Sequence, residues 1–254
     1  MVRGITLVIG LMVALASGPV WAQAAPGGRG AEDGLRAFQA LADRDWDLAV
    51  FYATRAIEAG ALADGDRAAV HAYRADALRH KGDFVAAIDD YDIGLKIGYP
   101  PAFRARVLNN RGIAFYAVGL FDLSIEDYTE ALNLAPEFAA ALDNRGTSYM
   151  AMGLFDFAID DYAAAIALDP NNYHAFNNRG RAFLELRFYE EAIVNFTAAL
   201  DLGSPSPTPI FNRAMAYEGL GDRDRALEDL AMAHRLSPNE PTYQEKFQEY
   251  GLLQ

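Results

Sequence analysis

The sequence contains no cysteine. This absence excludes disulfide bonds, thiolate nucleophiles, zinc–thiolate sites and lipid attachment through a cysteine side chain. Basic residues are also scarce, because 22 Lys and Arg stand against 35 Asp and Glu and leave a net charge of −13. Nucleic acids and anionic membranes bind clustered positive charge, so the sequence predicts no nucleic-acid partner.

Catalytic motifs are missing as well. The four histidines, His71, His80, His174 and His234, are scattered without metal-ligand spacing, and neither a nucleophile elbow nor a phosphate-binding loop occurs. No nucleophile, base and orienting group can be assembled from these residues. We therefore predict no metal, no small-molecule cofactor and no enzymatic activity.

The first 22 residues have the pattern of a secretory signal peptide. Arg3 precedes an apolar run over residues 5–16, Gly18 and Pro19 interrupt that run, and Val20 and Ala22 occupy the −3 and −1 positions of a cleavage site. We expect cleavage near Ala22, with Ala24 as the second choice and an uncleaved membrane anchor as the alternative. This predicts an exported bacterial protein, periplasmic or secreted.

Residues 23–31 are rich in small residues, and Pro26, Gly27 and Gly28 disfavour regular structure. This composition predicts a flexible tether.

A triplet recurs in the remainder of the chain. The triplet Asn-Arg-Gly begins at Asn110, Asn144 and Asn178, and Asn-Arg-Ala begins at Asn212. The spacing is 34 residues in all three intervals. A fixed period of this length is the signature of a helical repeat protein.

The residues around each triplet resemble the tetratricopeptide repeat family. The fourth copy carries the family's small, aromatic and closing residues as Gly146, Tyr149, Gly153, Ala158, Tyr162, Ala165 and Pro170. The resemblance covers about residues 32–240. It implies an all-α fold, a right-handed solenoid in which antiparallel helix pairs stack and each pair buries its apolar face against its neighbours.

The 34-residue frame predicts about six repeats over residues 32–241 and a capping helix over residues 242–254. Gly119, Gly153 and Gly221 fall where first helices should end. The approximate ranges of the repeats are 32–66, 67–104, 105–138, 139–172, 173–206 and 207–240.

An arginine follows the asparagine in every triplet, where the family usually has leucine. Aspartate recurs on the second helices, so we predict structural ion pairs between each arginine and the preceding repeat, with a ligand-binding arginine column as the alternative. The expected pairs are Arg111 with Asp90, Arg145 with Asp127, and Arg179 with Asp161.

The asparagine column is the candidate binding site. In the family the first helices line a concave groove, and a side-chain amide offers both a donor and an acceptor to a peptide backbone. The alternative is that these amides bridge neighbouring helices. The predicted groove residues are Asn110, Asn144, Asn178, Asn212, Asn109, Asn177, Asp143, Arg181 and Tyr116.

These observations predict a non-catalytic, exported scaffold that binds a protein or peptide in its groove. A self-associating structural subunit of an envelope assembly is the first alternative, which would make the protein a homo-oligomer. A regulator or accessory of an envelope hydrolase is the second.

Overall fold

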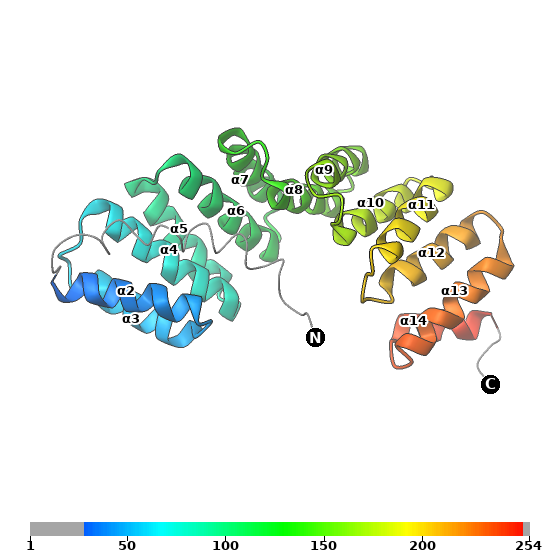
Figure 1. Cartoon of the computed structure of the whole chain (residues 1–254), viewed down its shortest axis with the longest axis horizontal. Helices are drawn as coiled ribbons and strands as arrows, with labels where there is room; N and C mark the ends of the chain where they lie inside the picture. Colours follow the sequence, from blue (N-terminus) through cyan, green and yellow to red (C-terminus); the bar gives the residue numbers. More distant parts are fainter. Residues whose placement is uncertain (1–27, 251–254) are drawn as a thin grey trace. The chain divides into compact units, whose positions relative to one another are not determined.

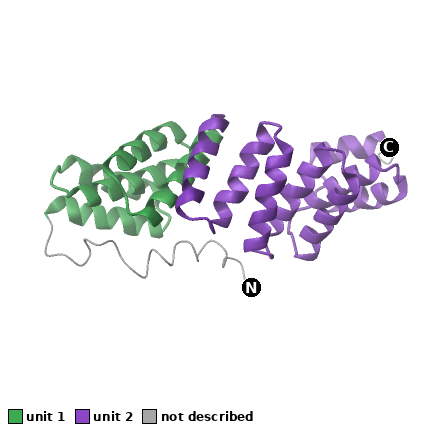
Figure 2. Cartoon of the chain, turned by 90° about the horizontal axis from the view of Figure 1, so that it is seen from above, with its two compact units in different colours: residues 1–118 green, residues 119–254 purple. Residues whose placement is uncertain are grey.

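The computed structural model describes residues 28–250, and every regular element among them is an α-helix (Figure 1). The chain divides into two compact units, residues 1–118 and 119–254, each of which is described by itself (Figure 2). The thirteen helices of the described residues are α2 (Arg29–Ala42), α3 (Trp46–Glu58), α4 (Asp64–Lys81), α5 (Phe84–Ile97), α6 (Pro101–Ala117), α7 (Phe121–Leu134), α8 (Ala139–Ala151), α9 (Phe155–Leu168), α10 (Tyr173–Glu185), α11 (Tyr189–Asp201), α12 (Thr208–Gly219), α13 (Arg223–Leu236) and α14 (Pro241–Glu249).

Helices that follow one another in the sequence pack together within each unit. In unit 1, α2 packs on α3 and α4 on α5, while α3 contacts α4 and α5 contacts α6. In unit 2 the pairs α8–α9, α10–α11 and α12–α13 form, and each is joined to the next by the same kind of contact. The predicted all-α fold of stacked antiparallel helix pairs is confirmed. None of the described helices is both long and apolar enough to span a membrane.

The turns inside the helix pairs depend on one residue in the left-handed region. Gly119, Gly153 and Gly221 have φ of 81°, 74° and 79°, directly after or near the ends of α6, α8 and α12 as the sequence predicted. A residue without Cβ adopts this conformation at low cost. Arg44 and Arg187 take the same place in two other pairs, with φ of 60° and 63°.

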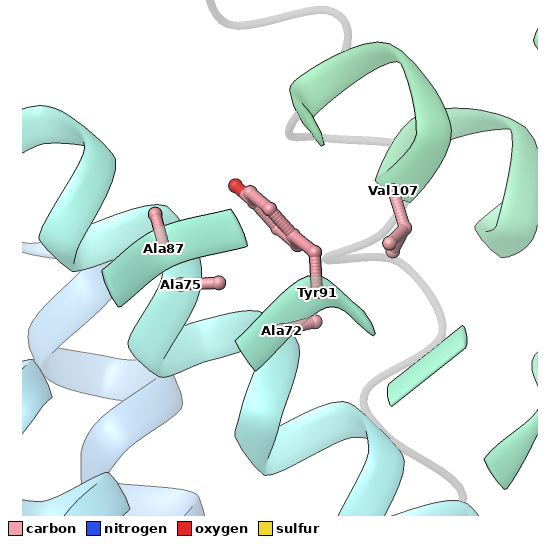
Figure 3. Packing of buried hydrophobic residues seen from close by; sticks show 5 residues of the cluster. All are labelled: Ala72, Ala75, Ala87, Tyr91 and Val107. Carbon is pink, nitrogen blue, oxygen red and sulfur yellow. The ribbon is translucent and has the colours of Figure 1, made fainter. Parts of the chain in front are cut away.

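Small side chains and one aromatic ring form the core between helices. In unit 1 the Tyr91 ring of α5 is fully buried among Ala72 and Ala75 of α4, Ala87 of α5 and Val107 of α6 (Figure 3). The alanines allow the helix backbones to approach closely enough for the ring to fill the remaining space.

Glycine stands at two close approaches between the helices of a pair in unit 2. A Cβ on Gly146 would lie 2.9 Å from the ring of Tyr162, and a Cβ on Gly180 would lie 2.7 Å from the ring of Phe196. Each contact joins the first and second helix of one pair. These two glycines therefore set the separation of α8 from α9 and of α10 from α11.

The ends of the chain differ in part from the sequence-based boundaries. Helix α2 begins at Arg29, so the predicted tether of residues 23–31 is too long: residues 29–31 are helical, and Gly30 is buried against Ala56 and Ala59. A C-terminal helix is present as α14, whose Tyr243 stacks on Phe211 with ring centroids 4.6 Å apart. The predicted signal peptide of residues 1–22, its cleavage site and residues 251–254 lie outside the described residues.

Candidate functional site

Three arginines at matching places in α4, α8 and α12, Arg74, Arg145 and Arg213, each bind an aspartate of their own helix pair. Arg145 donates from Nε and Nη2 to the two carboxylate oxygens of Asp161 at 2.8 and 2.7 Å. Arg213 binds Asp229 in the same way at 2.7 and 2.8 Å. Arg74 binds Asp90 through two bonds of 2.7 Å. Such two-pronged bonds between charged groups are strong and strongly directional.

The third arm of each of these arginines reaches the preceding helix pair. Nη1 of Arg145 donates to the Thr129 hydroxyl at 3.0 Å, and Nη1 of Arg213 donates to that of Thr197 at 3.0 Å. Arg74 makes the corresponding bond to Thr54 at 3.2 Å. One guanidinium thus joins three helices, which we call the arginine clamp.

The predicted partner of Arg145 was therefore wrong. Arg145 lies eight residues before Gly153 and Asp161 lies eight residues after it, so the tight turn places the two side chains opposite each other in one antiparallel pair. The sequence argument had placed Arg145 against Asp127 of the preceding repeat instead. Equal distance from the turn is the better rule for these helices.

The other two predicted pairs were wrong for related reasons. Asp90 is occupied by Arg74 and by Nδ1 of His71, 2.8 Å away, and Arg111 donates instead to Asp92 of α5. Asp161 accepts both of its hydrogen bonds from Arg145, so it is not the partner of Arg179. Nε of Arg179 donates to the side-chain oxygen of Asn195 at 2.7 Å.

The ionisation of these groups reflects their partners. Burial raises the pKa of Asp90, but the hydrogen bonds and charges of Arg74 and His71 outweigh it and leave that pKa below its ordinary value. The hydrogen bond to Asp161 raises the pKa of Arg145. Burial instead lowers the pKa of Arg179, because a neutral amide stands where the other clamps have a carboxylate.

The asparagine column of unit 2 is a hydrogen-bonded ladder between repeats. The Asn212 amide donates to the side-chain oxygen of Asn177 at 3.4 Å, and Asn177 donates to that of Asn178 at 3.4 Å. The Asn178 side chain in turn forms a hydrogen bond with Asp143 of α8. Burial raises the pKa of Asp143, and this hydrogen bond lowers it in part. Oδ1 of Asp143 is buried without a hydrogen-bond partner.

Unit 1 contains a shorter ladder of the same kind. Asn109 donates to the side-chain oxygen of Asn110 at 3.2 Å, and Asn110 donates to Oδ1 of Asp76 at 2.8 Å. The Tyr91 hydroxyl, above the core of Figure 3, donates to the same oxygen. Asp76 was missed by the sequence argument, although it lies one 34-residue period before Asn110.

The remaining predicted groove residues, Asn144, Arg181 and Tyr116, lie on α8, α10 and α6. The backbone oxygen of Asn144 accepts from the Ser148 hydroxyl at 3.3 Å, and the Asn144 side chain is half-buried. Arg181 of α10 and Tyr116 of α6 are exposed. The ladder residues therefore serve first as joints between repeats, which is the bridging interpretation that the sequence left open.

One face of the first helices in unit 2 stays open to solvent. Helix α10 contacts both α8 and α12, so the three first helices form a row. Gly146 and Ser148 are buried, whereas the residues on the opposite face are half-buried or exposed. We call this set the first-helix face: Thr147 and Met150 of α8, Arg181 and Leu184 of α10, and Met215 and Glu218 of α12.

A hollow of about 410 Å³ lies at the C-terminal end of unit 2. Glu218, Arg223, Glu249 and Tyr250 line it, together with Gly221. It shares Glu218 with the first-helix face and no residue with the ladders. Within residues 28–250, no group of three histidine or acidic side chains is arranged to hold a metal ion.

Stacked antiparallel helix pairs, joined by a repeated polar ladder and clamp, define a helical-repeat protein. Two stretches, residues 105–138 and 144–207, match models of the tetratricopeptide repeat. A comparison of the sequence with curated proteins gives no match.

Several solved structures share this fold. The chain resembles a structure titled as a functional characterization of PilF from Pseudomonas aeruginosa, with a TM-score of 0.70 and 20% identity over 87% of this chain and 97% of that one. A MamA structure gives a TM-score of 0.60 and 24% identity over 74% and 97% of the two chains. YrrB, described as a TPR protein with an unusual peptide-binding site, gives 0.62 and 19% over 77% and 97%. At these identities the likeness establishes the fold.

Proposed function

We propose that the protein is an exported scaffold that binds a protein or peptide partner along the first-helix face of unit 2. Tetratricopeptide-repeat proteins are typically non-catalytic scaffolds for protein interactions, and the similar structure of YrrB is described as having a peptide-binding site. Export rests on the signal-peptide pattern of residues 1–22.

The observation that carries this proposal is the composition of the first-helix face. In α8 and α10 it repeats one polar and one apolar residue per helix: Thr147 and Met150, then Arg181 and Leu184. Apolar pockets beside polar anchors are what a bound peptide requires. The ladder behind this face holds its helices in register, so the surface is preformed and little ordering is needed on binding.

The ladder also changes the choice of test. Replacing Asn178 would remove a joint between repeats, so a loss of binding could follow from a loss of folding. Met150 and Arg181 carry no such bond among the described contacts. The sharper variant is Met150→Ala with Arg181→Glu, and its control is Met232→Ala with Arg235→Glu on the exposed side of α13.

The experiment begins with the mature chain from Gln23, immobilised and exposed to envelope extract, followed by mass spectrometry of the retained protein. The purified partner is then titrated with wild type and both variants after their folding is checked by circular dichroism. We expect the first-helix variant to bind about tenfold more weakly, a change of roughly 1.4 kcal/mol, and the control to bind as wild type does. Equal weakening by both variants would exclude the first-helix face.

The two alternatives have their own outcomes. A self-associating subunit would show a concentration-dependent mass by light scattering without any partner. A hydrolase regulator would change the rate of an envelope hydrolase when the two are mixed. N-terminal sequencing of exported protein tests localisation, and full-length chain retained in washed membranes would contradict cleavage near Ala22.

A further inference from the structure

The second helices begin in one backbone conformation but with two kinds of residue. In α3, α5, α7, α9, α11 and α13 the N-cap residue has φ between −89° and −83° and ψ between 63° and 85°. It is an aspartate in α3, α5 and α13, and its carboxylate accepts a backbone N–H three residues later at 3.0, 3.3 and 3.1 Å. In α7, α9 and α11 it is Leu120, Leu154 and Phe188, which make no such bond.

These three apolar caps gain no burial in exchange for the lost hydrogen bond. Leu120, Leu154 and Phe188 remain 47%, 39% and 51% exposed. Aspartate is among the best N-cap residues and leucine is among the worst, so the chain is less stable here than its own turn geometry allows. The same departure occurs in three successive repeats, 34 residues apart.

Further apolar side chains that are exposed to solvent lie near these caps in the sequence. They come from the same turns and from the first turn of the second helices, and α7 to α11 pack one on the next in unit 2. We call the set the turn-edge patch: Leu120, Leu123, Met152, Leu154, Phe157 and Phe188. The patch is distinct from the first-helix face, because its residues belong to the turns and the second helices.

The border of the patch is acidic. Exposed carboxylates follow each apolar cap within the first two turns of its helix, and Arg187 is the one basic residue in the turns and helix starts concerned (residues 119–126, 152–160 and 186–191). The acidic residues are Asp122, Glu126, Asp156, Asp160, Glu190 and Glu191. Together with a net charge of −13, this border repels a second copy of the chain and an anionic membrane, and attracts a basic partner.

We propose that the turn-edge patch docks an amphipathic segment of another protein whose apolar side chains are flanked by Lys and Arg. The apolar side chains of that segment cover the three caps, and its basic residues meet the acidic border. Covering the caps removes their apolar side chains from water, and this burial stabilises the complex. It offsets the hydrogen bonds that aspartate would have made at the same positions.

The test uses a variant that repairs the caps and removes the patch together. Leu120→Asp, Leu154→Asp and Phe188→Asp convert the three turns to the form seen in α3, α5 and α13. The control, Val85→Asp with Val194→Asp and Met232→Asp, adds the same charge at exposed positions that are not N-caps. The probes are two labelled helical peptides of about 14 residues, near four turns, one built of Leu and Lys and one of Leu and Glu.

We expect wild type and control to bind the Leu/Lys peptide and the cap variant to bind it at least tenfold more weakly, although that variant is more acidic. The cap variant should also melt at a higher temperature than wild type. Equal binding by the cap variant would overturn the proposal, since charge alone would then explain it. It would also be overturned by equal binding of the Leu/Glu peptide, by wild-type dimers that the cap variant abolishes, or by binding to anionic vesicles in place of the peptide.

Discussion

Helix pairs α8–α9 and α10–α11 stand one period apart, and four of the differences between them concern the turn, the clamp and the ladder. The turn residue is Gly153 in the first pair and Arg187 in the second, and the clamp acid Asp161 becomes Asn195. The clamp threonine lies in the helix that precedes each pair, where Thr129 of α7 is matched by Ala163 of α9. The ladder residue Asp143 becomes Asn177. The backbone is nevertheless alike, as the matching contacts of Tyr162 on Gly146 and Phe196 on Gly180 indicate.

The comparison separates what shapes a repeat from what stabilises it. Small residues and a ring at fixed positions set the geometry in both pairs. The ion pair of the clamp is present in the first pair and absent from the second, where Arg179 meets the neutral Asn195. We therefore expect α10–α11 to be the less stable of the two pairs, and four sets of substitutions test the difference.

The largest difference is expected from removing the clamp arginines. Arg145→Ala leaves Asp161, 8% exposed, as a buried charge without its partner, which costs about 3 kcal/mol of unfolding free energy. Arg179→Ala removes a cation that has only a neutral amide as partner, and should cost about 1 kcal/mol. Urea unfolding followed by circular dichroism measures both. Equal losses would mean that the Asp161 pair adds nothing.

Restoring the carboxylate should come next in size. Asn195→Asp gives Arg179 the acid that Arg145 has, at the expense of the bond from Asn195 to the Glu191 carbonyl at 2.8 Å. We expect a gain of about 1 kcal/mol. The matched control is Asp161→Asn, which should lose at least as much. A loss in both variants would show that the second pair has adapted to a neutral clamp.

The turn residue should have a similar or smaller effect. Arg187 has φ of 63°, where a side chain crowds the backbone, so Arg187→Gly should gain about 1 kcal/mol. Gly153→Arg, at a matching turn with φ of 74°, is the reverse change and should lose stability. Thermal melting of the two variants beside wild type is sufficient. No gain at position 187 would point to a compensating contact of the arginine.

The smallest effect, and one that depends on pH, is expected at Asp143. Burial raises its pKa above the ordinary value of 3.8, so the folded state holds this proton more tightly than the unfolded state does. Above about pH 3.8 the unfolded state loses this proton first, so stability falls until pH passes the folded pKa, where the cost of the carboxylate is complete; below about pH 3.8 there is no cost. Asp143→Asn, the residue of the next repeat, should stabilise the protein at neutral pH and leave acid stability unchanged. A pH-independent gain would contradict this.

The fold could be predicted almost completely from the sequence because its cause repeats. The 34-residue period, the small residues and the turn glycines each recur, so a single pattern located α4 to α13. The start of α2 was missed because Gly27, Gly28 and Gly30 indicate irregular structure. Gly30 is instead the close contact of that helix with α3.

The candidate site could be predicted only in part. The asparagine and arginine columns were found, but the partner of each side chain depends on which helices face each other across a turn. Arg145 has acids at matching places on two neighbouring helices, and spacing alone did not choose Asp161 over Asp127. The ladder had a clearer signal in Asp76, which lies one period before Asn110 and carries a fitting acceptor.

The clamp and ladder bonds also bear on how the chain folds. They join residues at most 35 positions apart, within one helix pair or between neighbours. No distant segment has to arrive before such a bond can form, so the order of folding can follow the order of synthesis. A chain that leaves the ribosome residue by residue can thus complete one helix pair after another, and exposes little more than one unfinished pair at a time.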